Sequence, residues 1–202
     1  MRVLVVTAVA AEREAIAAVL PAGSGVDLLV GGVGPAAVAA ATAGSLDGVE
    51  LVLSAGIGGG FGPLRPGDIA VASTIVFADL GAETADGFVP MSQLGFGGER
   101  YDVGPKLAVE LADRTGGHLG TILTMATVTG SAATAAGLSG RFPDAVAEGM
   151  EGAGVAAAGA LRGVPFGEIR AVSNVVGPRD RAAWQIPLAL QSLGRAVAAA
   201  VA

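Results

Sequence analysis

Short apolar runs alternate with helix-forming segments along the whole chain, and this alternation limits the fold more than any other feature. Val3–Val6, Val26–Val30 and Ile69–Phe77 are almost uninterrupted apolar runs of strand length. Strands have this composition when helices cover both faces of a mainly parallel sheet. The pattern therefore predicts an α/β protein whose mixed, mostly parallel sheet is flanked by helices on both faces.

The same pattern predicts the other elements. Further strands are expected at Glu50–Ala55, Leu119–Met125, Asp144–Ala147 and Glu168–Ser173. Helices are expected at Glu12–Leu20, Ala36–Leu46, Pro105–Thr115, Thr129–Leu138, Gly152–Leu161 and Ala183–Val201. Residues 78–103 show no clear period and are expected to form an irregular insertion, of the kind that often carries function. No repeat, linker or change of composition interrupts residues 1–202, so a single domain is expected.

Composition excludes several classes of function. The chain of 202 residues contains no Cys and one His, His118, which excludes thiol nucleophiles, Cys-bound zinc and multi-His metal sites. No metal or other cofactor is expected. The net charge of −6, with Lys106 as the only Lys, argues against a nucleic-acid groove. No run of ~18 non-small apolar residues offers a membrane span.

The surface is expected to carry few charges, because only 15% of the residues are charged. A homodimer or larger homo-oligomer would cover part of such a surface. Ala- and Gly-rich codon usage explains the same composition, and both explanations stay open. The first ten residues superficially resemble a signal peptide. Their apolar stretch is short, β-branched and followed by Glu12-Arg13-Glu14, so a buried strand and a cytoplasmic protein are expected.

Two glycine-rich segments are candidates for binding a ligand. Gly32–Ala37 matches a dinucleotide-binding fingerprint, but the next strand ends in Ser54-Ala55-Gly56 without the acid that would bind a ribose, so NAD is not expected. Gly56–Gly62 holds five glycines in seven residues. That many glycines are entropically expensive in a plain turn, so we expect a loop that offers its N–H groups to a ligand. A flexible turn between strands is the alternative.

Three polar residues lie where ligands bind in such a sheet, beyond the carboxyl ends of strands. They are Glu12, Glu151 and Asn174. Each has an ordinary structural explanation when taken alone. The two acids suit the first turn of a helix, and Asn is a frequent turn former.

Five segments, in chain order, share one resemblance: Val3–Glu12, Ser54–Asp68, Phe142–Ala145, Met150–Ala153 and Arg170–Asn174. Together they resemble the nucleoside phosphorylase/hydrolase family, in its branch with methylthioadenosine/S-adenosylhomocysteine nucleosidase. The resemblance covers nearly the whole chain. A more specific resemblance, to hydrolases that release hypoxanthine in menaquinone biosynthesis, rests on Ala78–Glu83, Ser173–Asp180, Trp184 and Ile186-Pro187.

The resemblance implies roles for three of these residues. Glu12 matches the acid that activates the attacking water, Glu151 the acid that accepts hydrogen bonds from the ribose hydroxyls, and Met150 a residue that packs on the sugar. Cleavage of an N-riboside passes through an oxocarbenium-like sugar, which a nearby carboxylate stabilises. A carboxylate at position 12 would also repel a phosphate dianion, so water is favoured as the nucleophile.

Position 174 indicates which base is released. The adenine-specific relatives have Asp there, whereas this chain has Asn174. An amide donates to a 6-oxo group and accepts from a protonated N7. With adenine, the amide NH2 would face the 6-amino group, and the unpaired donors would cost ~1–3 kcal/mol of binding free energy. The resemblance therefore implies hydrolysis of the N-glycosidic bond of a 6-oxopurine nucleoside. Asn174 cannot supply the leaving-group proton, so water must protonate N7.

Further substrate contacts are expected at Gly56, Thr127 and Val128, the last two through their backbone. Phe88 is a candidate for the 5′ pocket, and it is expected to reach into the site of a neighbouring subunit. Three alternatives stay open. They are a 6-oxopurine nucleoside phosphorylase, a methylthioadenosine/S-adenosylhomocysteine nucleosidase, and a nucleoside-binding protein without catalytic activity.

Overall fold

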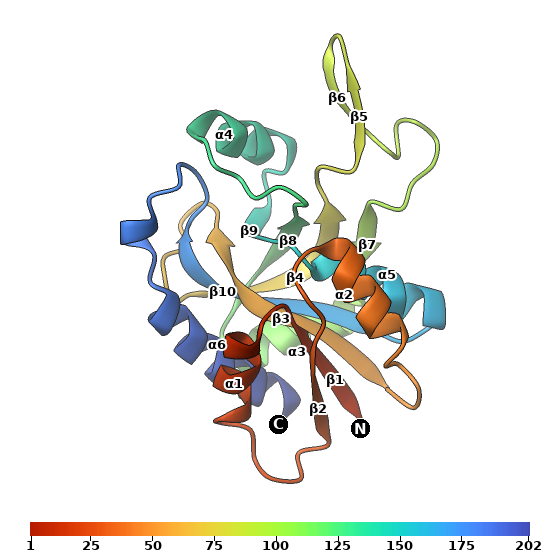
Figure 1. Ribbon diagram of the computed structural model, residues 1–202, viewed down its shortest axis with the longest axis vertical. Helices are drawn as coiled ribbons and strands as arrows, with labels where there is room; N and C mark the ends of the chain where they lie inside the picture. The colour runs from red at the N-terminus through yellow and green to blue at the C-terminus, as the bar shows by residue number, and fades with distance from the viewer.

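An eight-stranded mixed sheet organises the chain, and the computed structural model describes all residues from 1 to 202 (Figure 1). Its strands are β1 (Val3–Thr7), β2 (Val26–Val30), β3 (Leu51–Gly60), β4 (Ile69–Phe77), β7 (Arg100–Asp102), β8 (His118–Thr124), β9 (Ala145–Gly149) and β10 (Phe166–Val175). Five pairs of neighbouring strands are parallel and three are antiparallel. The predicted mixed, mostly parallel sheet is confirmed.

The sheet closes on itself. Its strand order is β10-β4-β8-β9-β3-β1-β2, and β10 also pairs with β3. Strands β3 and β10 run in parallel register from Val52 opposite Phe166 to Gly60 opposite Val175. The closure brings the carboxyl ends of β3, β8, β9 and β10 around one opening.

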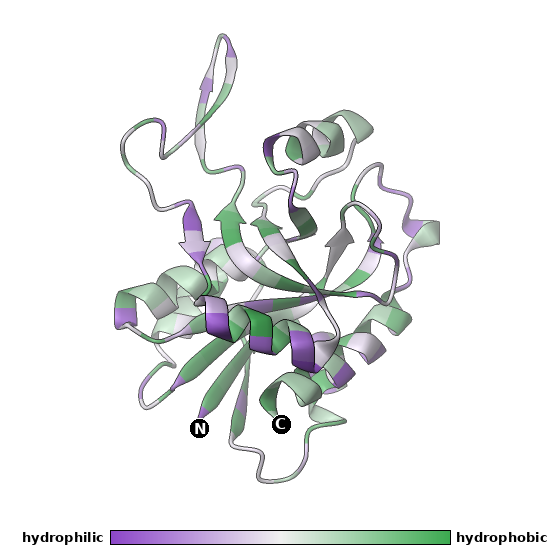
Figure 2. Ribbon diagram, turned by 180° about the vertical axis from the view of Figure 1, so that it is seen from behind, coloured by the Kyte–Doolittle hydropathy of each residue, from purple (hydrophilic) through white to green (hydrophobic).

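Helices cover both faces, as predicted. Helices α1 (Ala10–Ala17), α3 (Pro105–Thr115) and α6 (Ile186–Val201) pack on one side, and α2 (Pro35–Ala43) and α5 (Gly152–Arg162) pack on the other (Figure 1). Strand β1 shows why its apolar run is continuous. Val3 and Val5 join the core under α6, whereas Leu4 and Val6 join the core under α2 and α5. Figure 2 shows strands that are mostly hydrophobic and helices in which hydrophobic and hydrophilic residues alternate.

The insertion at residues 78–103 is more ordered than expected. It contains a hairpin of β5 (Gly81–Thr84) and β6 (Gly87–Pro90), which projects from the sheet (Figure 1), and the strand β7, which pairs with β4. The hairpin is largely exposed, so its residues show no apolar alternation. The sequence pattern therefore could not indicate these strands.

Four helix starts also differ from the prediction, with α1 beginning at Ala10 instead of Glu12 and α2 at Pro35 instead of Ala36. Helix α4 (Ala132–Arg141) starts after Thr129, because the Ser131 side chain caps it by accepting from the Thr134 N–H at 3.1 Å. Residues Arg181–Ala183 form a separate 3-10 turn before α6. No helix is both long enough and apolar enough to cross a membrane.

Candidate active site

A cavity of about 360 Å³ opens where the carboxyl ends of β1, β3, β9 and β10 come together. Its wall combines residues that follow β1, β8, β9 and β10 with the glycine-rich end of β3. Glu12, Glu151 and Asn174, the three predicted catalytic residues, all line it. The structure thus brings together residues that are far apart in the sequence.

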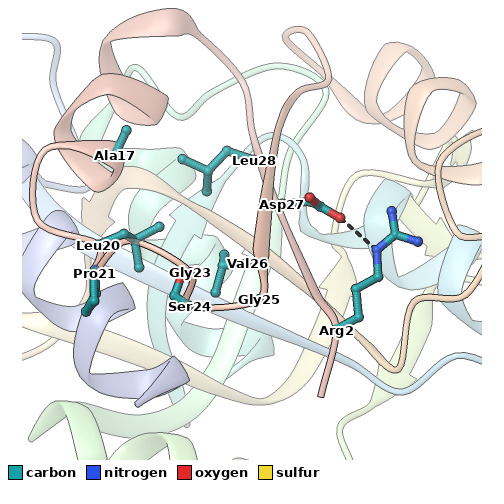
Figure 3. A pocket seen from close by; sticks show the side chains of 10 residues that line it. All are labelled: Arg2, Ala17, Leu20, Pro21, Gly23, Ser24, Gly25, Val26, Asp27 and Leu28. Carbon is teal, nitrogen blue, oxygen red and sulfur yellow. Dashed lines mark hydrogen bonds and ion pairs between the residues drawn. The ribbon is translucent and has the colours of Figure 1, made fainter.

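A larger depression lies at the opposite end of the strands, beside α1 and β2 (Figure 3). Its lining is mainly small and aliphatic, and its charged groups are one ion pair, in which Arg2 Nε donates to Asp27 Oδ2 at 2.8 Å. Both of these side chains are about half exposed. The depression offers no group that is set apart for catalysis, so the first cavity is the candidate site.

Glu12 is held in place by three backbone donors. Its Oε2 accepts from the N–H groups of Ala8 at 2.9 Å and Val9 at 3.3 Å, and its Oε1 accepts from Ile57 N–H at 2.9 Å. The side chain is 3% exposed, although it lies in the first turn of a surface helix. The carboxylate is therefore fixed, and one lone pair, on Oε1, stays free.

The glycine-rich segment is not the loop that the sequence predicted. Gly56 to Gly60 belong to strand β3, whose backbone pairs with β10 on one side and, at its end, with β9 on the other. A Cβ at Gly56 would lie 2.5 Å from Arg170 Nη1 and 2.7 Å from Glu12 Oε1. The glycine is needed because these two side chains approach the strand closely. Gly56 itself does not line the cavity, whereas Gly58 and Gly59 do.

Glu151 lies at the start of α5 and accepts hydrogen bonds from three protein donors. Its Oε1 accepts from Gly34 N–H at 3.1 Å, and its Oε2 accepts from Arg170 Nη1 at 3.1 Å and Met150 N–H at 3.3 Å. Gly34 belongs to the segment that matched a dinucleotide fingerprint. Its N–H therefore serves a carboxylate of the protein. Met150 lines the cavity beside Glu151, as predicted.

Arg170 connects the site to the core. Besides Glu151 it binds Glu168 Oε1 through Nε at 2.8 Å and Ser54 Oγ through Nη2 at 3.0 Å. Burial by itself disfavours the cation, but the charges of Glu168, Glu151 and Glu12 raise the pKa of Arg170 above its usual value. For Glu168, burial raises the pKa of the carboxyl group, whereas the positive charge of Arg170 lowers it. The prediction from sequence did not assign Arg170 or Glu168 a role, although two charges inside an apolar strand were a signal.

Glu148 is a further cavity residue that the sequence prediction missed. It is 6% exposed, at the end of β9. Its Oε1 accepts from Thr129 N–H at 2.8 Å and its Oε2 from Thr129 Oγ1 at 2.5 Å. Burial raises its pKa, while the two bonds from Thr129 act in the opposite direction. Its position directly after the apolar run of β9 was the available signal.

Asn174 is oriented by its neighbours. Its Oδ1 accepts from Ser173 Oγ at 2.7 Å and its Nδ2 donates to the Val175 carbonyl at 3.0 Å. One amide hydrogen and one carbonyl lone pair stay free for a ligand. Arg179, the only cation among the cavity residues, stacks on Trp184 with its Cζ 5.3 Å from the ring centroid.

Of three further predicted substrate contacts, one lines the cavity and two lie outside it. Val128 lines the cavity, but Thr127 is exposed outside it, on a loop held by Asp79, which accepts from the N–H groups of Ala126 and Thr127 at 3.1 Å. Phe88 lies on β6, beside a separate cavity of about 240 Å³, with Arg141 Cζ 4.6 Å from its ring centroid. Within one chain Phe88 does not reach the candidate site, so its role across subunits stays a prediction.

The chain is similar to proteins of known family. The profile described as the Phosphorylase superfamily matches residues 7–202. Futalosine hydrolase of Streptomyces coelicolor is 52% identical over 98% of this chain and 94% of its own length. That of Acidothermus cellulolyticus is 47% identical over 97% and 88%. The structure of methylthioadenosine/S-adenosylhomocysteine nucleosidase from Colwellia psychrerythraea with adenine shares the fold, with a TM-score of 0.87 and 23% identity over 100% of this chain and 94% of that chain.

Proposed function

Because the chain belongs to the phosphorylase superfamily, we propose that it is an N-ribosylhydrolase that converts futalosine and water into dehypoxanthine futalosine and hypoxanthine. Two relatives named futalosine hydrolase match almost the whole chain. The observation that carries the proposal is the placement of Glu12, Glu151 and Asn174 in one cavity. Menaquinone biosynthesis is the pathway that this activity serves.

Glu12 acts on the nucleophile. Three backbone N–H groups hold its carboxylate, so it does not need to reorganise when a water molecule binds. The water attacks C1′ of the ribose while the C1′–N9 bond breaks, and Glu12 accepts a proton from it. The negative charge of Glu12 also stabilises the positive charge that develops on the sugar.

Glu151 binds the ribose. Gly34 donates to Oε1, whereas Arg170 and Met150 donate to Oε2, so one lone pair on Oε1 stays free for a sugar hydroxyl. Arg170 positions Glu151 without lining the cavity. Met150 offers an apolar contact to the sugar.

Asn174 binds the leaving base. Its free amide hydrogen donates to O6 of the purine, and its free carbonyl lone pair accepts from N7–H. Water delivers the N7 proton, because the amide has no proton to give. An adenine nucleosidase is the less favoured alternative, since adenine would place its amino group against the amide NH2.

Water is favoured over phosphate as the nucleophile. Glu148 joins Glu12 and Glu151 in the cavity wall, so a phosphate dianion would face three carboxyl groups with few compensating charges. The Ile57 N–H of the glycine-rich segment is already engaged by Glu12. A 6-oxopurine phosphorylase is therefore disfavoured. A binding protein without catalysis would have no need of an oriented Glu12.

The working form that we propose is a homodimer or larger homo-oligomer in the cytoplasm, with residues 1–202 as one catalytic domain. The projecting segment at residues 81–98 supports an assembly. It exposes Phe88, Leu94 and Phe96, which are 39%, 39% and 77% exposed. Large apolar side chains on a projecting arm are typical of a contact surface.

One assay tests the activity. The purified protein is incubated with futalosine, inosine and methylthioadenosine, with and without inorganic phosphate, and released bases are separated by chromatography. We expect hypoxanthine from futalosine at a rate that phosphate does not change. Strict phosphate dependence would assign a phosphorylase. Preferential release of adenine would assign the adenine nucleosidase, and no release from any substrate would contradict an enzyme.

A further inference from the structure

Glu168 and Arg170 are the two charged residues of the apolar strand β10. They are two positions apart, so their side chains leave the strand on the same face. This face packs against α5, because Val172, two positions further along, joins a core cluster with Ala153 and Ala156 of that helix. Glu168 is 0% exposed and Arg170 is 1% exposed. Charges this deeply buried are tolerated only where they are paired.

The carboxyl group of Glu168 holds the guanidinium of Arg170 in one orientation. Its Oε1 accepts from Arg170 Nε at 2.8 Å. The other two nitrogens donate to Ser54 Oγ at 3.0 Å and to Glu151 Oε2 at 3.1 Å. A guanidinium is planar, so the bonds at Nε and Nη2 set the direction in which Nη1 points toward Glu151.

Glu168 also touches the backbone next to Glu151. Gly152 follows Glu151 and is the first residue of α5. A Cβ at Gly152 would collide with the Glu168 carboxyl group, with Oε1 at 2.5 Å and with Oε2 and Cδ even closer. The carboxyl group therefore packs directly against the backbone of Gly152. Glu168 thus supports Glu151 from two sides, through Arg170 and through the first residue of the helix.

Stability does not explain why the strand carries this acid. Glu168 does not line the candidate cavity, and its buried Oε2 has no hydrogen-bond partner in the chain. An unsatisfied carboxyl oxygen in the core is unfavourable. A buried ion pair is often no more stable than apolar residues of similar volume. What Glu168 contributes is the orientation of Arg170.

We propose that Glu168 is a positioning residue for the contact between Glu151 and the ribose. The inference rests on the proposed function and deepens it. Glu151 Oε1 accepts from Gly34 and keeps one lone pair for a sugar hydroxyl, while Arg170 donates only to Oε2. Without Glu168 the guanidinium would be free to turn and bind both oxygens of Glu151, as arginine commonly binds a carboxylate. The lone pair for the sugar would then be occupied.

Two substrates that differ only in their ribose hydroxyls test the proposal. Futalosine has the 2′ and 3′ hydroxyls and 2′,3′-dideoxyfutalosine lacks them, so the ratio of their kcat/KM values reports the contact with Glu151. We expect Glu168→Met to lower this ratio by about tenfold or more. Glu168→Gln keeps an oxygen for Arg170 Nε, so its ratio should stay within about threefold of the wild type. An unchanged ratio in Glu168→Met, or equal losses in both variants, would overturn the proposal.

Leu193→Ala is the control for general destabilisation. Leu193 is fully buried in the core under α6, on the opposite face of the sheet from Glu168. Its truncation should lower the stability of the fold and leave the ratio unchanged. A merely structural role of Glu168 would likewise lower kcat/KM for both substrates equally. A fall of the ratio in Leu193→Ala as large as that in Glu168→Met would contradict the proposal.

Glu168→Asp keeps the test decisive if Glu168→Met does not fold. It retains the charge but shortens the side chain by one methylene, so the carboxyl group withdraws from Arg170 Nε and the ratio should again fall. An unchanged ratio in this variant would overturn the proposal. If the wild type releases no hypoxanthine from futalosine, the proposed function fails. A crystal structure of the Asp variant then decides the positioning, because Arg170 should bind both oxygens of Glu151, and an unmoved Arg170 would contradict it.

Discussion

Arg170 lies directly against Glu151, with Nη1 donating to Oε2 at 3.1 Å, and both side chains are less than a tenth exposed. The same guanidinium binds Glu168 and Ser54 in the core. One cation therefore connects a cavity carboxylate to the sheet. Its planar group of five donors binds three partners in fixed directions, whereas the ammonium group of a lysine is a compact point charge on a flexible stem.

Arg170→Met is expected to destabilise the protein by about 3–5 kcal/mol, because it leaves buried carboxyl groups without their cation. Urea unfolding measures the change. Arg162→Met is the matched control. It breaks an ion pair with Asp47, in which the two side chains are 43% and 91% exposed, and it should cost about 1 kcal/mol or less. Equal losses in both variants would argue against the network.

Glu12→Gln is expected to lower kcat by about a hundredfold or more while hypoxanthine still binds, because an amide cannot accept the proton of water. Single-turnover kinetics and calorimetry separate the two effects. Glu14→Gln makes the same chemical change on the exposed side of α1 and should leave kcat unchanged. Near-normal turnover in Glu12→Gln would remove Glu12 from the mechanism.

Asn174→Asp is expected to reduce hypoxanthine release about thirty- to a hundredfold at neutral pH, which corresponds to ~2–3 kcal/mol of transition-state stabilisation. An ionised Asp faces O6 with acceptors only. Activity should partly return at lower pH, where a protonated Asp can donate. The ratio of kcat/KM for hypoxanthine and adenine nucleosides, measured across pH, checks both effects. A constant ratio would show that residue 174 does not touch the base.

Glu148→Gln is expected to raise Tm by about 2 °C at pH 8 and to leave it unchanged at pH 4. Burial raises the pKa of Glu148, assisted slightly by the charge of Asp79. The folded state therefore binds the proton more tightly than the unfolded state. Stability from this group is present below the ordinary carboxyl pKa and is lost as pH rises through the raised value. Calorimetric scans across this range should show the difference growing with pH; a difference independent of pH would contradict the buried titration.

Light scattering at assay concentrations is expected to give the mass of a dimer or larger assembly. Phe96→Glu places a charge on the most exposed aromatic of the projecting segment, so it should lower the mass and the activity together. Full activity of a monomeric wild type would contradict the proposed assembly.

Local patterns in the sequence determined the order of the six helices and of all strands except β5, β6 and β7. Val26–Val30, Ile69–Phe77 and Pro105–Thr115 have the predicted bounds, because the apolar period and the Pro and Gly boundaries act within a few residues. The same reasoning placed Glu12, Glu151 and Asn174 in one cavity. Glu12 follows β1 and Asn174 lies at the end of β10, and both strands run parallel to β3, so their carboxyl ends meet at one edge of the sheet. Glu151 follows β9, which is antiparallel to β3, and it joins them because the end of β9 pairs with Gly59 and Gly60 at the end of β3.

Only the tertiary structure decided which residues those side chains contact. Gly34 and Glu151 are 117 positions apart, and the register that sets Gly59 between Glu148 and Asn174 depends on pairing between distant strands. A glycine in a sequence indicates that the backbone is free to adopt many conformations. It does not indicate whether a turn, a ligand or a neighbouring side chain requires the absence of a Cβ. Gly56 is required by Arg170 and Glu12, and both contacts arise only when the sheet closes through β3 and β10. Long-range register depends on the packing of the whole core, which local periodicity does not encode.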